Sequence, residues 1–291
     1  MTRAALCAAL VASGACRAPA PRQSVDRVVV AETEAAQRLE GAGVGPDEVL
    51  RVAVEALRSS RTFGPRAPDG AAARRWLGRV AVHRAEATGG AAGPSAHVVL
   101  TLELSPQESG GTLRETARAV EPVGAGPRAL RDAFSRATAS ALERAVGGFA
   151  LLLAAERKRE DELVADLGAP DARVRDCAVR VLADRKSRAA VPALVERLAD
   201  PDPEVVERAI GALGQIGDPA AVPPLVRLAQ KRQGPSVAHL ARIIGDVGGP
   251  DARSYLLTLA SGHADPLVRA AAQQALDEME ARTAEAGPAR P

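Results

Sequence analysis

The string Ala190-Val191-Pro192-Ala193-Leu194 returns 31 residues later as Ala221-Val222-Pro223-Pro224-Leu225, and this repetition decides the fold of the C-terminal half of the chain. Other apolar residues keep nearly the same step over four units: Val174, Val205, Val237, Val268, and in the same frame Ala178, Ala209, Ala241, Ala272. A period of roughly 30 to 50 residues is typical of a solenoid, in which each unit buries its apolar face only against its neighbours. We therefore expect an all-α solenoid over residues 156–282.

The first, second and fourth units begin with an aspartate and a proline that favour the start of a helix, as in Asp200-Pro201-Asp202 and Asp265-Pro266. An aspartate can accept hydrogen bonds from the free N–H groups of the first turn. Val, Ala and Leu then follow at helical spacing on the first helix of the unit (helix A), which places Leu213 in the core. Gly217 and Gly248 are expected to end such helices, because glycine adopts the left-handed conformation readily. The second helix of each unit (helix B) carries an apolar stripe that includes Leu194 and Leu225.

These elements resemble HEAT repeats of the short, phycobilisome-lyase-like subclass over roughly residues 160–280. The Asp-Pro turn and the Val-Arg, Ala, Leu-Gly and Ala-Val-Pro-Leu elements occur in the same order and frame as in that family. The third unit departs from the pattern, because Gly234-Pro235-Ser236 replaces the acidic turn and Arg253-Ser254 replaces Val-Pro. The resemblance implies a scaffold that binds proteins, although a fold alone does not fix a function.

Residues 25–155 predict a small α+β domain. Residues 25–31 are apolar and β-branched, which favours a strand, and a helix should begin at Pro46 with Leu50, Val54 and Leu57 on one face. A Pro- and Gly-containing loop is expected at residues 63–70. Three segments with alternating apolar residues follow, and they predict an antiparallel sheet with one covered face. The alternating apolar residues are Trp76, Val80, Val82, Val98, Leu100, Leu102 and Leu104, with a weaker third segment at residues 112–120.

A helix from Pro127 onward is expected to cover this sheet. Its apolar stripe consists of Leu130, Phe134, Ala137, Ala141 and Ala145. The pair Gly147-Gly148 is expected to bend or end the helix, since glycine is unfavourable inside one.

The first residues indicate a bacterial lipoprotein signal. Residues 4–12 are apolar but too few to span a bilayer, which suits a short signal peptide at residues 1–15. Ser13-Gly14-Ala15-Cys16 resembles a lipobox, with Ser13 where the family prefers an aliphatic residue. We therefore expect lipidation of Cys16, followed by a tether at residues 16–24. At the other end of the chain, we expect a disordered tail at residues 283–291. Cleavage near Ala18 or Ala20, or a cytosolic protein with an Ala-rich N-terminus, are the alternatives.

This signal predicts a lipid-anchored protein of the bacterial cell envelope that faces the periplasm, on the outer rather than the inner membrane. Residues 161–291 carry 16 Lys and Arg against 19 Asp and Glu, whereas the whole chain has a net charge of +2. Neither part has the basic excess of a nucleic-acid-binding protein, so no nucleic-acid partner is expected. Once Cys16 is lipidated and Cys7 removed, only Cys177 remains, which leaves no intramolecular disulfide.

No residue pattern indicates catalysis. No glutamate follows any of the four histidines (His83, His97, His239, His263), so the His-Glu pairs that bind two irons in one HEAT-like enzyme family are missing. No zinc-binding spacing, phosphate loop or nucleophile elbow is present either. We therefore expect a non-enzymatic protein without cofactor or metal. A bilin-lyase-like subunit, or an envelope assembly factor that acts through the α+β domain, are the alternatives.

One row of residues on the B helices is the candidate binding site. Alignment of the repeats at 31 residues stacks two rows that lie off the apolar stripe: Ala193, Pro224 and Tyr255, and beside them Glu196, Arg227 and Thr258. Both rows are expected on the inner surface of the curved solenoid. Tyr255 is either a binding residue, since tyrosine is enriched in binding hot spots, or a packing residue of a degenerate repeat. The sequence therefore predicts a protein-binding adaptor with Glu196, Arg227, Tyr255 and Thr258 in contact with an unidentified protein partner.

Overall fold

The computed structural model describes residues 23–60, 62–64, 75–90, 93–108 and 110–285. The chain divides into two compact units, residues 1–150 and 151–291, and each is described by itself. The division between residues 150 and 151 lies inside a helix that ends at Ala155. The boundary expected from the sequence lies five residues later, at the end of this helix. Unit 1 holds a mixed sheet with helices, and unit 2 holds only helices, so the predicted fold class, α+β followed by an all-α solenoid, is confirmed.

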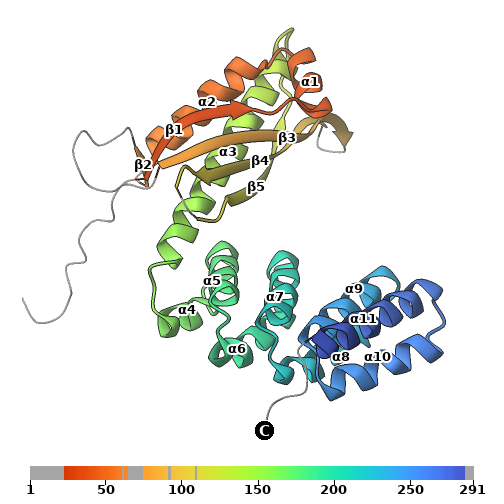
Figure 1. The fold of residues 1–291 in the computed structure, drawn as a ribbon. Helices are drawn as coiled ribbons and strands as arrows, with labels where there is room; N and C mark the ends of the chain where they lie inside the picture. The colour runs from red at the N-terminus through yellow and green to blue at the C-terminus, as the bar shows by residue number, and fades with distance from the viewer. Residues whose placement is uncertain (1–22, 61, 65–74, 91–92, 109, 286–291) are drawn as a thin grey trace, which may run out of the picture. The chain divides into compact units, whose positions relative to one another are not determined.

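The sheet of unit 1 has five strands in the order β2-β1-β3-β4-β5 (Figure 1). Their bounds are β1 Gln23–Val30, β2 Phe63–Gly64, β3 Arg75–Gly90, β4 Gly93–Pro106 and β5 Leu113–Pro122. β3, β4 and β5 are antiparallel, as predicted, but β1 is parallel to both β2 and β3, so the sheet is mixed. The short strand β2 occupies the first two residues of the expected loop, so that expectation was wrong for Phe63 and Gly64, and residues 65–70 lie outside the described residues.

The parallel pairing of β1 follows from its connection to the strands that flank it. Two helices, α1 (Glu34–Gly41) and α2 (Pro46–Ser59), separate β1 from β2 and β3, and such a crossover returns the chain in the same direction. The sequence pattern did not predict α1. Thr33 begins this helix, because its side chain accepts a hydrogen bond from the N–H of Ala36 and donates one to the carbonyl of Val82.

Alternation along the strands divides the sheet into a buried and an outward face. Trp76, Val80 and Val82 of β3 are fully buried, as are all four apolar residues predicted for β4. The pairing between β3 and β4 shifts between Val82 and Arg84, so His83 is an extra residue in β3. On α2 the buried residues are Val49, Ala53, Ala56 and Leu57, while Leu50 and Val54 are only half-buried. The predicted apolar face of α2 is therefore rotated toward Val49 and Ala53.

Helix α3 (Ala129–Ala155) lies on the same side of the sheet as α2 (Figure 1). Phe134, Ala137, Ala141 and Ala145 are buried as predicted, but Leu130 is 42% exposed and does not cover the sheet. Gly147 and Gly148 do not end α3, which continues to Ala155. A Cβ atom on Gly148 would lie 2.9 Å from a carboxylate oxygen of Glu115. This glycine therefore permits a close approach of β5 to the helix rather than a break.

Hydrogen bonds join α3 to its neighbours in unit 1. Arg131 donates to Glu48 of α2 over 3.0 Å, and Ser135 donates to the same carboxylate over 2.6 Å. At the edge of the sheet, Arg144 donates to the backbone carbonyl of Arg118 (2.7 Å) and Arg136 to that of Pro122 (3.0 Å). α3 is thus fixed both to α2 and to the outer edge of β5.

By length and composition α3 is the one helix in the described part of the chain that could cross a membrane. Half of its most apolar window is buried within the protein, and its arginines bond to backbone carbonyls of the sheet. These contacts are those of a helix that packs in the core of its unit.

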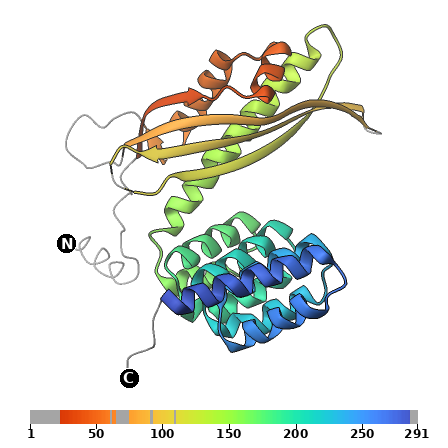
Figure 2. The ribbon, with the colours of Figure 1, turned by 45° about the vertical axis from the view of Figure 1, so that its right-hand side comes forward.

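Unit 2 consists of helix pairs that follow one another along the chain (Figure 2). The A helices are α5 (Ala172–Asp184), α7 (Pro203–Ile216), α9 (Pro235–Val247) and α11 (Pro266–Glu285), and each packs on the next. The B helices are α4 (Glu160–Asp166), α6 (Val191–Glu196), α8 (Val222–Ala229) and α10 (Pro250–Gly262). Short 3-10 turns flank α6 and precede α8: Arg188–Ala190, Arg197–Ala199 and Pro219–Ala221. α11 continues to Glu285, past the limit of 282 expected from the sequence.

The repeat frame predicted from the sequence matches the core of unit 2. Leu182, Leu213 and Leu276 are buried, and the framed alanines are fully buried in all four units, whereas Val174 is only half-buried. Gly217 ends α7 with a φ of 68°, in the left-handed region. Asp171 and Asp202 accept hydrogen bonds at the starts of α5 and α7, as expected for helix caps. Cys177 is buried.

Candidate functional site

The B helices of unit 2 carry the predicted row of binding residues. Burial confirms the register on which the row depends, because Ala190, Ala221 and Ala252 are fully buried, and so are Leu194, Leu225 and Leu256 at the next core position. Glu196, Arg227 and Thr258 share one position of this register in three successive repeats. All three side chains are exposed, so the row (the B-helix row) lies on the solvent side of the B helices.

Tyr255 lies beside this row and is half-buried. Desolvation raises the pKa of its hydroxyl, which is the expected effect of partial burial on a phenol. Ala193 and Pro224, at the same position in the two preceding repeats, are also half-buried. Thr258 donates a hydrogen bond to the backbone carbonyl of Ser254 (3.0 Å), and the side chain of Glu196 is 73% exposed. The structure thus brings the four predicted residues onto one exposed side of the repeats, and their role in binding stays a prediction.

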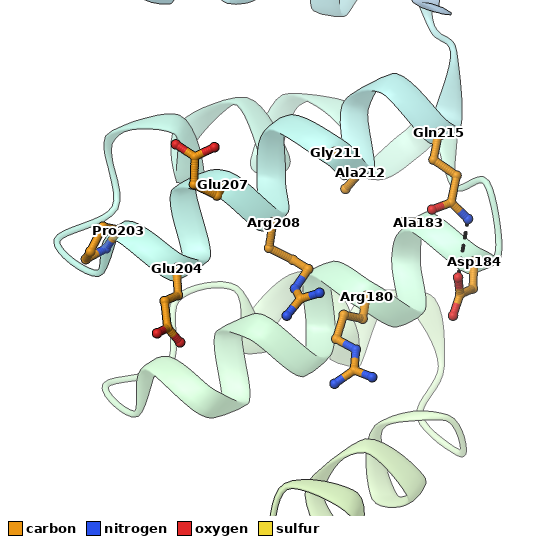
Figure 3. A pocket seen from close by; sticks show the side chains of 10 residues that line it. All are labelled: Arg180, Ala183, Asp184, Pro203, Glu204, Glu207, Arg208, Gly211, Ala212 and Gln215. Carbon is orange, nitrogen blue, oxygen red and sulfur yellow. Dashed lines mark hydrogen bonds between the residues drawn. The ribbon is translucent and has the colours of Figure 1, made fainter. Parts of the chain in front are cut away.

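A groove of about 780 Å³ lies between the A helices α5 and α7 (Figure 3). The sequence pattern did not predict this groove. Its floor includes small residues, Ala183 from α5 and Gly211 and Ala212 from α7. Addition of a Cβ atom at Gly211 would meet nothing within 4 Å. The exposed Gly211, one helical turn after Glu207 and Arg208 on α7, was the signal in the sequence that could have indicated this groove.

Charged and amide side chains form the walls of the groove. Arg208 donates to Asp176 over 2.7 Å, and Gln215 donates to Asp184 over 3.3 Å, which bridges the two helices. Glu204 points toward α5 like Arg208, whereas Glu207 points away from it (Figure 3). The residues that line the groove include no histidine, cysteine, serine or threonine. The charged and amide groups of the groove suit recognition through ion pairs and hydrogen bonds.

A buried ion pair joins the first two repeats. Arg175 donates to both carboxylate oxygens of Asp200, over 2.6 and 2.8 Å, and also to the backbone carbonyls of Ala169 and Pro170. Burial alone would raise the pKa of Asp200, but the hydrogen bonds from Arg175 and from the N–H of Asp202 outweigh it, so this pKa is lowered. Arg269 makes the corresponding bonds to the carbonyls of His263 and Ala264 in the last repeat. Arg175 therefore fixes the turn between repeats, a role that the Val-Arg element alone did not reveal.

Other sequence-based candidates carry little chemistry. Within the described ranges, no group of three or more His, Cys, Asp or Glu side chains is placed to bind a metal. His239 is exposed on α9, in agreement with its interpretation as a helix-surface residue. Cys16 and Cys7 lie outside the described residues, so lipidation stays a prediction.

Comparison with known proteins agrees with this architecture. The model of the family described as HEAT repeats matches residues 160–241, which begin at α4 and extend into α9. No curated protein matches the chain. The helical unit, with its 31-residue frame and its alternating A and B helices, is therefore a HEAT-like repeat array.

Proposed function

We propose that this chain is a non-enzymatic adaptor that binds a partner protein through the surface of its HEAT-like repeats. Arrays of this kind commonly serve as protein-interaction scaffolds, because stacked repeats offer an extended surface that varies independently of the core. The observation that carries the proposal is the B-helix row, in which one register position is exposed in three consecutive repeats. Arg227 and Tyr255 are the strongest candidates, since arginine and tyrosine are enriched among residues that dominate binding energy.

The proposal is tested by cross-linking the purified full-length protein to the partners that it captures. The cross-linked proteins are then identified. The variant Arg227→Ala with Tyr255→Ala should recover less of a given partner than the wild type, at an unchanged melting temperature. Arg242→Ala is the matched control, because Arg242 is exposed on the A helix α9, away from the B-helix row. Equal recovery by the double variant would exclude the B-helix row.

A second variant decides whether the groove between α5 and α7 binds the partner instead. Gly211→Arg would direct a long side chain into the groove, and its Cβ would meet no atom within 4 Å. Loss of capture in this variant alone would place the partner on the A helices. A chromophore or metal that co-purifies with the wild type would contradict the non-enzymatic adaptor itself.

We further propose that the adaptor is anchored to the bacterial cell envelope through a lipid on Cys16. The support is the short apolar stretch that ends at Ser13-Gly14-Ala15-Cys16. Cys16→Ser should move the protein from the membrane fraction to the soluble fraction, while Cys7→Ser should leave it in the membrane fraction. Mass spectrometry of the mature N-terminus checks the result, and a chain that begins with unmodified Met1 would contradict lipidation.

A further inference from the structure

Within unit 1, helices cover one face of the sheet, and none of the elements that the structure describes in this unit covers the other face. The covered face is lined by Val98, Leu100, Leu102 and Leu104 of β4 and by their buried partners on β3 and β5. The residues between them in the sequence lie on the opposite side, since successive side chains of a strand alternate. We call this opposite side the open face.

The open face exposes aliphatic side chains. Val29 of β1 is 39% exposed, Leu77 of β3 is 43% exposed and Val120 of β5 is 47% exposed. Val29 pairs with Arg79 and Leu77 pairs with Arg27, so Val29 and Leu77 are diagonal neighbours on adjacent parallel strands. Together they form a small apolar patch with arginines on either side. Aliphatic groups in this surrounding are typical of a surface that another protein covers.

The open face also has an excess of positive charge. By register it carries six arginines (Arg27, Arg75, Arg79, Arg84, Arg114, Arg118) and two glutamates (Glu86, Glu103), and Arg75 pairs with Asp26 of β1. Glu103 accepts from Arg114 over 2.6 Å and lies 3.7 Å from Arg79, so one carboxylate serves two guanidinium groups. Glu86 pairs with Arg84 over 2.9 Å. Within the described part of the chain, the side chain of Arg118 makes no ion pair with a carboxylate. A partner would therefore have to supply the carboxylate that pairs with Arg118.

The centre of the open face is rigid. The hydroxyl of Thr101, which is only 5% exposed, lies 2.8 Å from Nε2 of His83 and 2.7 Å from the hydroxyl of Thr116. These contacts link three adjacent strands and satisfy the polar groups internally. A partner would therefore meet a preformed surface whose side chains need little ordering, which favours binding.

Three other occupants fit this face less well. A second copy of the chain would bring two faces of the same positive charge together, which is unfavourable. Single-stranded nucleic acid usually stacks its bases on aromatic side chains, and the described residues of the open face include none. An amphipathic membrane-binding surface commonly offers tryptophan or phenylalanine beside its basic residues, and these too are missing from the described open face.

We propose that the open face binds an acidic surface of a partner protein, whose carboxylates pair with Arg79, Arg114 and Arg118 and whose apolar residues cover Val29 and Leu77. This site lies on unit 1, so it is independent of the binding role proposed for the repeats. It assigns a partner chemistry to the α+β unit, which the repeat resemblance does not describe.

The test uses the full-length protein and a fluorescent synthetic peptide in which glutamate alternates with leucine. Fluorescence anisotropy should show saturable binding that weakens as salt is raised, because the contacts are ionic. Arg118→Glu and Leu77→Ser should each weaken binding by about tenfold. Arg51→Glu is the matched control, since Arg51 is exposed on α2, on the covered side of the sheet, and should change binding less than twofold.

The proposal is overturned if the wild type does not bind the peptide, or if Arg51→Glu weakens binding as much as Arg118→Glu at equal melting temperatures. Vesicles of anionic phospholipid and a single-stranded oligonucleotide serve as competitors. Displacement of the peptide by either one at a lower concentration than unlabelled peptide would assign the face to a membrane or a nucleic acid and refute an acidic protein partner. Arg227→Ala with Tyr255→Ala should bind the peptide like the wild type, which separates this result from the fate of the repeat surface.

Discussion

Asp171 and Asp200 both belong to the turns that open successive repeats, and their surroundings give them different roles. Asp171 is exposed and accepts a hydrogen bond from the N–H of Arg173, as a helix cap does. Asp200 is buried and receives two hydrogen bonds from Arg175, so it joins one repeat to the next. The sequence shows an aspartate in both places. The partner that distinguishes them lies 25 residues away from Asp200 and becomes visible only in the folded chain.

Removal of the buried carboxylate of Asp200 should therefore lower the free energy of unfolding more than removal of the helix cap at Asp171. Asp200→Ala leaves a buried guanidinium without its partner and should lower the free energy of unfolding by about 3–5 kcal/mol. Asp171→Ala removes a single exposed cap and should cost about 1 kcal/mol. Urea unfolding of both variants measures the difference. Equal losses would show that the Arg175–Asp200 pair contributes no more than a surface cap.

Acid should weaken the same contact. Because the pKa of Asp200 is lower in the folded protein than the roughly 3.9 of an unfolded aspartate, the unfolded chain takes up the proton first as the pH falls. The stabilisation is complete above about pH 5, and it is lost progressively as the pH falls below 4 through the folded pKa. Asp171 acts in the same direction, since hydrogen bonds from the Arg173 side chain and backbone lower its pKa. Melting curves recorded from pH 7 to pH 3 should fall less steeply for Asp200→Asn than for the wild type.

The repeat frame gives a further test at two residues that have opposite environments. Leu213 is fully buried, and Leu213→Ala should lower the free energy of unfolding by about 2–5 kcal/mol. Arg227 is exposed on the next B helix, and Arg227→Ala should change it by less than about 0.5 kcal/mol. A large loss in Arg227→Ala would contradict the register on which the B-helix row depends.

Among the elements, the contacts between successive A helices differ in how closely the backbones approach. A Cβ atom on Gly245 of α9 would lie 2.8 Å from the Cβ of Ala275 on α11, and one on Gly214 of α7 would lie 2.9 Å from Ile243 on α9. At Gly211 of α7, by contrast, the space is open toward the groove. The same residue type thus permits tight packing at one helix contact and lines a groove at another.

This difference predicts opposite effects of one substitution. Gly211→Ala should raise the free energy of unfolding by about 0.5–1 kcal/mol, because alanine favours a helix over glycine and meets no neighbour. Gly245→Ala should lower it by about 1–3 kcal/mol, because α9 and α11 must move apart. Thermal unfolding of the two variants under one condition measures both signs. Stabilisation by Gly245→Ala would mean that α9 and α11 do not pack this closely in solution.

The elements also show where sequence patterns stop being informative. Helical spacing and strand alternation predicted most elements, because these local periods determine which face becomes buried. The direction of β1 was not predictable in this way, since it depends on pairing with β3, about 50 residues later. Gly148 looked like a helix breaker, but its neighbour Glu115 comes from a strand more than 30 residues earlier. The short helix α1 lacks a strong apolar stripe and depends on the bond from Thr33 to Val82.

At the scale of the molecule, the two units should fold separately. The stability of a repeat array is approximately a sum over the interfaces between neighbouring repeats, so a fragment of residues 151–291 contains nearly all the contacts that hold it together. Circular dichroism of this fragment should be strongly helical, and its melting temperature should lie close to that of the repeats in the full chain. A disordered spectrum would show that the repeats need unit 1 to fold.

The candidate binding surfaces were only partly predictable over the whole chain. The positions of Glu196, Arg227, Tyr255 and Thr258 on one exposed side followed from the 31-residue frame, since equivalent residues of a repeat occupy equivalent places. The groove between α5 and α7 did not follow, because it depends on the spacing between two helices. The open face of the sheet could be inferred from strand alternation, but its charge emerged only when the strand order placed arginines of β1, β3 and β5 together.

The two arginines of α3 at the edge of β5 have a consequence for the behaviour of many copies in one place. A bare strand edge can recruit the edge of another molecule, and such zippering is a route to fibrils. Arg144 and Arg136 already occupy the carbonyls of Arg118 and Pro122, so an incoming strand would have to displace two charged donors before it could pair. We therefore expect this edge to resist strand pairing between neighbouring copies, including copies that a lipid anchor would crowd together.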